Sequence, residues 1–476
     1  MVTGENLVQR SHPVSNATDA GMTRHAMSSR HGLTTRRMTP DTLIAPFASN
    51  ERSQLAHVAM PARNVSALRH GYDQVRAQTE RLCDPLVTED FVVSSMPDVS
   101  PTKWHLAHTS WFFETFVLTP HVAGYQPLNA RYAYLFNSYY VQAGERHCRA
   151  QRGLVTRPTV QEVFSYRAWV DEAMRSLMES LASDPANAVW SLIEIGLHHE
   201  QQHQELLITD IKHVFFTNPL RPAYRTEQTF PSPAAPQGWQ SVAEGMYEIG
   251  HAGEGFHFDN ESPRHRTYLP GASIAHRLVT NDEYAAFVED GGYTRASLWL
   301  SAGFALVNDA RWEAPLYWER SDGAWHEFTL HGMQPLDGNA PVTHVSHHEA
   351  DAFARWAGVR LPTEPEWEVA AVSHPVEGRF VDAQRFHPSS DARHAPQQFF
   401  GDVWQWTSSA YLAYPGYRPE PGAIGEYNGK FMSDQWILRG ASCATPRSHA
   451  RHTYRNFFPS DVRWQFTGIR LARDSR

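Results

Sequence analysis

The sequence predicts an α+β protein with more than one domain: an N-terminal four-helix bundle followed by a loop-rich α+β domain. Between about residues 65 and 216, apolar residues recur at steps of three and four, the spacing of one helix face. Beyond residue 240, short apolar runs alternate with Gly, Trp and turn signals, which is typical of short strands and loops. A chain of 476 residues is long enough for two or three separate cores.

Composition excludes several classes of protein. A net charge of −9 argues against a nucleic-acid or anionic-membrane partner. The three cysteines, Cys83, Cys148 and Cys443, form no CxxC pair, which excludes a disulfide scaffold and a thiolate zinc site. The sequence shows no signal-peptide pattern and no long apolar run, so we expect a cytoplasmic protein. The oligomeric state stays open.

Shifts in composition predict the domain boundaries. Residues 1–60 are rich in Ser, Thr, Arg and Pro with little periodicity, and we expect a disordered extension there. The bundle is predicted over residues 61–216 and a Pro-, Gln- and Ser-rich linker over 217–240. The second domain is predicted over 241–476, with convincing helices only near 281–289 and 346–356.

Four helices are expected in the bundle. The first covers about residues 65–82 and the second about 101–118. The third opens at Thr159, which forms a capping-box pattern with Glu162. The fourth is predicted to begin at Asp184-Pro185, an N-cap residue followed by proline at the first helical position. A long connection separates the second and third helices, as in some four-helix bundles.

Two histidines in the fourth helix predict a metal site. His199 and His203 lie four residues apart within the apolar stripe, so both rings project from one helix face. Two imidazoles are too few for a catalytic site, so a third ligand must come from another helix. His108 is the best candidate because it shares a stripe with Trp104 and Trp111, and His105 is the alternative.

Two metal chemistries compete for these residues. His199-Glu200-Gln201-Gln202-His203 matches the HExxH pattern of zinc hydrolases, in which Glu200 would activate a metal-bound water. The pattern is short, lacks the expected downstream ligand, and lies in a bundle with no edge strand for a peptide. A non-haem iron held by three histidines would instead leave positions free for two substrates and dioxygen.

Several motifs give the chain a strong resemblance to the ergothioneine-biosynthesis sulfoxide synthases. In the helical half these are Trp104-His105-Leu106-Ala107-His108, Phe136-Asn137-Ser138-Tyr139-Tyr140 and the run from His199 to Glu205. In the C-terminal half they lie at residues 258–261, 279–284, 360–364, 401–406 and 468–472. The resemblance implies a DinB-like four-helix bundle and a C-terminal domain of the formylglycine-generating-enzyme (sulfatase-modifying-factor) type, with a C-type-lectin-like fold.

The resemblance also implies an activity. It implies that His108, His199 and His203 bind Fe(II). It implies a reaction in which dioxygen (O2) joins the sulfur of cysteine to imidazole C2 of hercynine, trimethylated histidine, and leaves a sulfoxide.

The resemblance assigns roles to six further residues. Tyr139 and Tyr140 supply a proton or an electron during oxygen reduction in the branch that this chain resembles, although aromatic packing is the simpler interpretation from spacing alone. Arg149 and Arg152, which with Arg146 lie at three-residue spacing, suit the carboxylate of an amino acid. Gln202 and Asn456 are expected to contact hercynine.

One departure from the family pattern bears on the sulfur donor. Members that use γ-glutamylcysteine carry an Asp two residues and an Arg six residues after the equivalent of Asn456. This chain has Phe458 and Val462 there, which favours free cysteine. The same chemistry with γ-glutamylcysteine remains the alternative.

Four other functions are compatible with parts of the sequence. A formylglycine-generating enzyme needs a copper-binding cysteine pair, but the residue five positions after Cys443 is Ser448. Ovothiol synthases usually carry an appended methyltransferase, whose glycine-rich cofactor loop is missing here. A selenoneine-type synthase would share the metal residues. A lectin-like domain that only binds a ligand would not need the three histidines.

Overall fold

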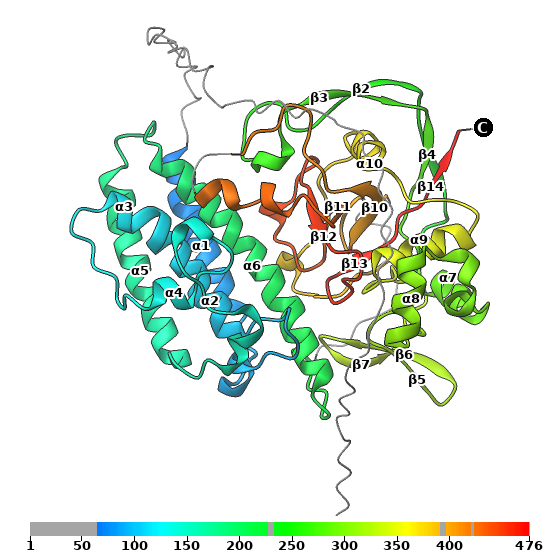
Figure 1. Cartoon of the computed structure of the whole chain (residues 1–476), viewed down its shortest axis with the longest axis horizontal. Coiled ribbons are helices and arrows are strands. Elements are labelled where there is room, and N and C mark those ends of the chain that lie inside the picture. Colours follow the sequence, from blue (N-terminus) through cyan, green and yellow to red (C-terminus); the bar gives the residue numbers. More distant parts are fainter. Residues whose placement is uncertain (1–63, 227–232, 391–396, 420–422, 476) are drawn as a thin grey trace, which may run out of the picture. The chain divides into compact units, whose positions relative to one another are not determined.

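The computed structural model describes residues 64–226, 233–390, 397–419 and 423–475. The predicted extension at residues 1–60 lies outside them, as do residues 227–232 of the predicted linker. Within the described residues, long helices are followed by short strands and helices, which confirms the α+β class (Figure 1). None of the helices described is both long and apolar enough to cross a bilayer.

Long helices form the N-terminal bundle, and two short ones lie in the connection between the second and the third. The bundle helices are α1 Val65–Arg81, α2 Thr102–Phe113, α5 Val160–Ser180 and α6 Val189–Thr217, and the short ones are α3 Thr119–His121 and α4 Tyr132–Leu135. The predicted second helix continues past α2 as a wider π-helical turn at Glu114–Leu118. The predicted capping box opens α5: Glu162 N donates to Thr159 Oγ1 at 3.2 Å, and Thr159 N donates to Glu162 Oε2 at 2.7 Å.

The predicted start of the fourth helix was wrong. Helix α6 begins at Val189, and Asp184 lies in the turn before it. Asn187 Oδ1 accepts the backbone N–H of Val189 at 3.1 Å, while the carbonyl of Asp184 accepts the indole N–H of Trp190 at 3.0 Å. The Asp-Pro pair therefore belongs to the turn before the helix, and the Asn187 side chain accepts the first helical N–H.

The C-terminal domain contains more helices than the sequence indicated. They are α7 Asn281–Glu289, α8 Ser301–Ala310, α9 His347–Trp356 and α10 Glu364–Ala371. Helices α7 and α9 lie where they were predicted, but the expectation of no other convincing helix was wrong. Helix α10 starts with its own capping box, in which Glu366 N donates to Thr363 Oγ1 at 3.3 Å.

The strands of this domain are short and form several small sheets. A four-stranded sheet has the order β12-β11-β10-β13, in which only β10 and β13 are parallel. Its strands are β12 Asn456–Phe458, β11 Trp436–Gly440, β10 Trp404–Ala410 and β13 Thr467–Gly468. A three-stranded sheet joins β1 Trp239–Val242, β4 Ala272–Ala275 and β14 Ala472–Asp474. Strand β2 Gly245–Ile249 pairs with β3 His265–Leu269, and β8 Gly378–Arg379 pairs with β9 Phe400–Gly401. In a further three-stranded sheet, β6 Ala324–Thr329 lies between β5 Trp318–Ser321 and β7 Gly332–Pro335.

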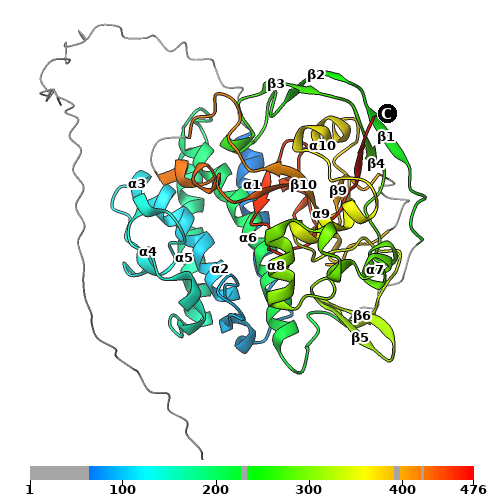
Figure 2. The same cartoon turned by 45° about the vertical axis from the view of Figure 1, so that its right-hand side comes forward.

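Helix α6 lies between the other bundle helices and the C-terminal domain (Figures 1 and 2), and its buried polar side chains contact that domain. Its Glu205 carboxylate accepts hydrogen bonds from the Trp404 indole at 2.8 Å and from the Thr445 hydroxyl at 2.8 Å. Further along the helix, the Lys212 ammonium lies 2.7 Å from His344 Nε2. These contacts fix α6 against the sheet that contains β10 and β12.

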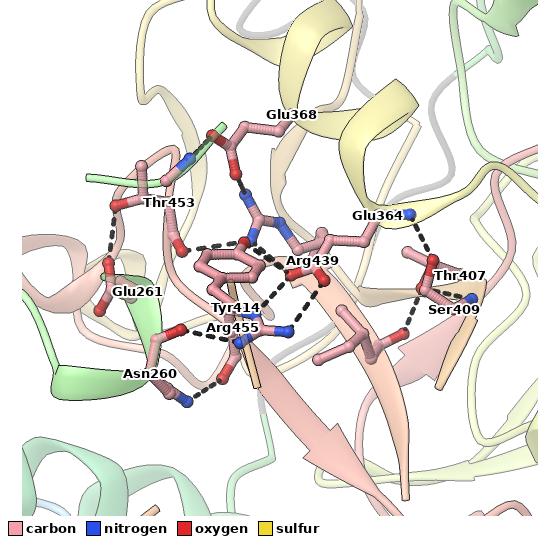
Figure 3. A network of polar contacts seen from close by, with 12 residues as sticks. Asn260, Glu261, Glu364, Glu368, Thr407, Ser409, Tyr414, Arg439, Thr453 and Arg455 are labelled. Atoms are coloured by element: carbon pink, nitrogen blue, oxygen red, sulfur yellow. Dashed lines mark hydrogen bonds and ion pairs between the residues drawn. The ribbon is translucent and has the colours of Figure 1, made fainter. Parts of the chain in front are cut away.

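A buried ion network supports the start of β12 (Figure 3). Arg455 donates to both oxygens of Glu364, at 2.7 and 3.0 Å, and Arg439 donates to the same carboxylate at 3.1 Å. All three side chains are buried. Burial alone would raise the pKa of Glu364, but the two guanidinium groups hold it below its ordinary value. The network therefore fixes the backbone that continues directly into Asn456.

Glu364→Gln should destabilise the protein by roughly 3–5 kcal/mol, because it leaves two buried guanidinium groups without their shared carboxylate. The depressed pKa means that folded Glu364 binds fewer protons than unfolded Glu364 at mildly acidic pH. Its contribution is complete above the ordinary glutamate pKa of about 4.3 and is lost as the pH falls below that value. Unfolding midpoints at several pH values should therefore show the variant and the wild type converging as the pH falls below that value.

Glu179→Gln is the matched control, since Glu179 pairs with Arg69 at an exposed position. Its loss should cost at most about 1 kcal/mol. A Glu364→Gln variant as stable as this control, or a deficit that does not change with pH, would contradict the role of the network.

Candidate metal centre

The structure brings His108 of α2 together with His199 and His203 of α6. One ring nitrogen of each histidine lies within 4.8 Å of those of the other two. All three side chains are buried. His108 Nε2 is 3.2 Å from His199 Nε2, and two ligand atoms at right angles around an ion, each about 2.1 Å from it, lie about 3 Å apart. The spacing of these nitrogens suits a shared metal ion.

Hydrogen bonding and burial set the protonation state of these rings. His108 Nδ1 lies 2.6 Å from the carbonyl oxygen of Phe136, which only accepts, so Nδ1 carries the proton and Nε2 presents its lone pair. Burial is the main cause that lowers the pKa of all three histidines, and it lowers that of His199 to about 3. Neutral imidazole is the form that binds metals, so the residues present fit a divalent ion.

Two tryptophans hold the His108 ring in place. The ring of Trp104 stacks on one side at a centroid distance of 4.5 Å and an angle of 13°. The Trp111 ring is nearly parallel to it at 5.4 Å and 16°. These residues lie four positions before and three after His108, so all three rings project from one face of α2. The stripe that the sequence indicated therefore orients a candidate ligand.

Glu200 is directed away from the three histidines. Its carboxylate accepts from Arg76 at 2.8 Å, from Arg167 at 3.0 Å and from the Thr79 hydroxyl at 2.6 Å. Burial opposes ionisation, but Arg76 and Arg167 lower the pKa of Glu200 to about 2. A carboxylate fully used in this way has no free oxygen for a metal-bound water. The geometry therefore contradicts the zinc-hydrolase interpretation of HExxH.

His105, the alternative third ligand, does not join the group of three. Its Nδ1 lies 2.9 Å from His203 Nδ1, and its Nε2 lies 3.1 Å from Asp210 Oδ2. Both of its nitrogens are thus engaged, one by His203 and the other by Asp210.

A cavity of about 1100 Å³ opens beside the histidines. Its lining includes His199 and His203, residues of the connection between α2 and α5, and residues of the C-terminal domain. The lining residues that the sequence singled out include Trp104, His105, Tyr139, Arg146, Arg149, Arg152, Gln202, Asn456, Phe458 and Val462. Both halves of the chain therefore contribute to one site.

The arginines occupy different depths of this cavity. Arg152 is buried, donates to the Ser100 hydroxyl at 2.9 Å, and places its guanidinium carbon 3.4 Å from the centroid of Trp104. Its Nε has no hydrogen-bond partner among the described residues. Arg149 is exposed and donates to the carbonyl of Asp98 at 2.6 Å. Arg152 thus offers a free donor at a buried position, next to the Trp104 ring that stacks on His108.

The two tyrosines form a stacked pair. Their ring centroids are 4.5 Å apart, and the Tyr139 hydroxyl donates to the Tyr140 hydroxyl at 3.4 Å. Tyr139 lines the cavity, while Tyr140 is fully buried behind it, 5.6 Å from the Trp111 ring. Burial raises the pKa of both phenols, so both are protonated at neutral pH.

Gln202 and Asn456 face the cavity from opposite domains. The Gln202 amide donates to the Tyr454 hydroxyl at 2.6 Å and accepts a hydrogen bond from the Tyr427 hydroxyl. Asn456 Oδ1 accepts the backbone N–H of Phe457 at 2.9 Å, which leaves its amide NH2 as a donor. The sequence did not identify Tyr427, whose ring lies 5.9 Å from that of His199. Its loop has no periodic pattern that would place it there.

Close packing of α6 on α2 depends on Gly196. A Cβ atom at this position would lie 2.4 Å from Phe113 Cε1, and Phe113 is fully buried. Gly196→Ala should therefore push the two helices apart and cost about 1–3 kcal/mol of stability. Because the helices hold His108 and His199, the variant should also bind Co(II) more weakly in an absorption titration.

Gly71→Ala in α1 provides the control, because its Cβ would meet only Leu197 Cδ1 at 3.9 Å. That substitution should stabilise the protein by about 0.5–1 kcal/mol, since alanine favours the helix interior. Equal stability of the two variants would contradict the tight helix contact.

Comparison with known proteins agrees with both halves of the fold. Residues 72–207 match the model of the DinB superfamily, and residues 226–398 match that of the sulfatase-modifying factor enzyme 1-like domain. The C-terminal half resembles the formylglycine-generating enzyme of Streptomyces coelicolor, with 37% identity over 44% of this chain and 80% of that protein.

Relatives over most of the length are enzymes named hercynine oxygenase. The protein from Mycolicibacterium smegmatis is 30% identical over 79% of this chain and 92% of its own length. The protein from Mycobacterium tuberculosis is 30% identical over 84% of this chain and 97% of its own length. The chain therefore belongs to the hercynine oxygenase family, the ergothioneine-biosynthesis sulfoxide synthases whose motifs it shares.

Proposed function

We propose that this protein is an Fe(II)- and O2-dependent sulfoxide synthase that joins the sulfur of cysteine to imidazole C2 of hercynine. The observation that carries the proposal is the group of three buried neutral imidazoles beside a cavity lined by arginines and aromatic rings. The reaction balances: the C2–H and S–H bonds are lost, one oxygen atom ends on sulfur, and the other leaves as water.

His108, His199 and His203 would hold the metal. Imidazole donors suit both iron and zinc, but zinc has no redox chemistry, so an oxygenase family favours iron. When bound, Fe(II) would supply the sites and electrons for dioxygen activation.

Arg152 and Arg149 would hold the carboxylate of cysteine. A guanidinium fork suits a carboxylate, and its hydrogen bonds are strongest where water is excluded. Arg152 is buried and its Nε has no partner in the described part of the chain. A carboxylate there would satisfy this donor and neutralise a buried charge next to Trp104.

Gln202 and Asn456 would hold hercynine. The Gln202 amide is fixed between Tyr427 and Tyr454, and Asn456 presents donors beside the aromatic residues Phe457 and Phe458. Aromatic faces attract a quaternary ammonium group by cation–π interaction. The cavity therefore offers polar contacts for the polar groups of hercynine and apolar rings for its trimethylammonium group.

Phe458 and Val462 bear on the sulfur donor. Both line the cavity, and neither supplies a charge for the additional carboxylate and amine of a γ-glutamyl group. This favours free cysteine as the sulfur donor.

A competition assay tests the donor. Equal concentrations of cysteine and γ-glutamylcysteine are supplied with hercynine, Fe(II) and oxygen, and the sulfoxides are separated by mass spectrometry. The hercynylcysteine sulfoxide should dominate by about tenfold or more, because a charged group left unpaired costs more than 1.4 kcal/mol. His199→Ala provides the background without a complete metal site. A dominant γ-glutamyl product would contradict the donor assignment.

The tyrosine pair makes a separate prediction. Tyr139→Phe should slow sulfoxide formation by roughly 10²–10⁴-fold, since a positioned acid contributes this much, and should divert cysteine to simple thiol oxidation. Tyr140→Phe should have a smaller effect of the same kind, because Tyr140 is fully buried and its hydroxyl contacts that of Tyr139. Product ratios measured for both variants check this. Unchanged product ratios in both variants would mean that the two tyrosines serve only in packing.

A further inference from the structure

His105 contacts one candidate metal ligand, His203. It is on α2, three residues before His108, and is buried. Its Nδ1 is 2.9 Å from Nδ1 of His203, and its Nε2 is 3.1 Å from Oδ2 of Asp210, which is also buried. Asp210, His105 and His203 thus form one line that ends at the group of three histidines.

The contacts of this line are consistent with a proton arrangement in which His203 can bind a metal ion. An ionised carboxylate only accepts, so His105 Nε2 carries a proton and donates it to Asp210. In the tautomer of His105 that donates from Nε2, Nδ1 can accept a hydrogen bond from the N–H of His203 Nδ1. His203 Nε2 is left with its lone pair free, which is the form that binds a metal ion.

The other two histidines have different supports. His108 Nδ1 donates to the Phe136 carbonyl at 2.6 Å. His199 Nδ1 has no hydrogen-bond partner among the described residues. Among the described residues, His203 is the ring of the three whose hydrogen bonds lead to a carboxylate. A carboxylate behind a histidine fixes the ring and raises its basicity.

Asp210 is itself held by a residue just before the start of α2. The backbone N–H of Ser100 donates to Asp210 Oδ2 at 2.9 Å, and the Ser100 hydroxyl accepts from Arg152 at 2.9 Å. The carboxylate is therefore held on the α2 side before any metal binds, as a positioning group must be.

We propose that His105 and Asp210 are positioning residues that hold His203 in its metal-binding tautomer and orientation. This inference rests on the proposed function for the presence of a metal at His108, His199 and His203. It assigns His105 a role in support of a ligand, in place of the ligand role considered from sequence.

The test is Co(II) titration of the full chain, followed by visible absorption, which needs no substrate or turnover. His105→Leu removes the acceptor for His203 Nδ1 and should weaken Co(II) binding about 10–100-fold. His105→Gln keeps an amide oxygen that can accept this proton and should recover a large part of the affinity. Asp210→Asn, which keeps an acceptor but removes the charge, should fall between them.

His213→Leu is the matched control. It removes a hydrogen bond of a partly buried histidine on the same helix, to Ser95 at 2.7 Å, without touching the three histidines. Thermal unfolding of each variant shows that it is folded. Wild-type affinity in His105→Leu would overturn the proposal, as would equal losses in His105→Leu, His105→Gln and His213→Leu.

The proposed function fails in a different pattern. If the unaltered chain binds no Co(II), or if His199→Ala binds it as well as the wild type, the metal site itself is contradicted and the positioning role falls with it. If the unaltered chain binds one Co(II) that His199→Ala loses, the His105 series decides the positioning role alone.

Discussion

Burial of helix α6 on nearly every side is the constraint on which the site depends. Because the helix is buried, each of its polar side chains needs a hydrogen-bond or ion-pair partner, and these partners lie on different sides of the helix. Glu200 reaches Arg76 and Arg167 within the bundle, whereas Glu205 reaches Trp404 and Thr445 in the C-terminal domain. Leaving either carboxylate buried without its partners would cost several kcal/mol, which exceeds the net worth of most single contacts. The helix is therefore fixed in rotation, and His199 and His203 are directed between these two sides.

The same arrangement explains why one site needs both domains. Helix α2 supplies His108 and its stacked tryptophans, and the connection after it supplies Tyr139, Arg149 and Arg152. The C-terminal domain supplies Asn456, which follows the buried ion network of Glu364, Arg439 and Arg455. In this way a lectin-like domain acts as one wall of a cavity whose candidate metal ligands lie in the bundle.

Much of the bundle could be predicted from sequence because its signals are local. The i, i+4 pair in α6 and the stripe of α2 specify one face each, and the facing stripes bring the histidines together. The start of α6 was missed because Asp184-Pro185 has the signature of a helix start, while Asn187 supports the first N–H. Helix α10 carried a capping-box signal at Thr363 and Glu366 that its short length obscured. Tyr427 could not be found, because a loop residue reaches His199 only through tertiary packing. The partnership of Glu200 with Arg76 and Arg167 is equally non-local, so HExxH stayed ambiguous until the fold was known.

The most direct test of the account is anomalous diffraction from crystals of the full chain loaded with Fe(II) under anaerobic conditions. Data collected on either side of the iron absorption edge should show one peak within bonding distance of ring nitrogens from His108, His199 and His203. A peak at any other position, or a peak at these histidines that appears at the zinc edge alone, would contradict the account.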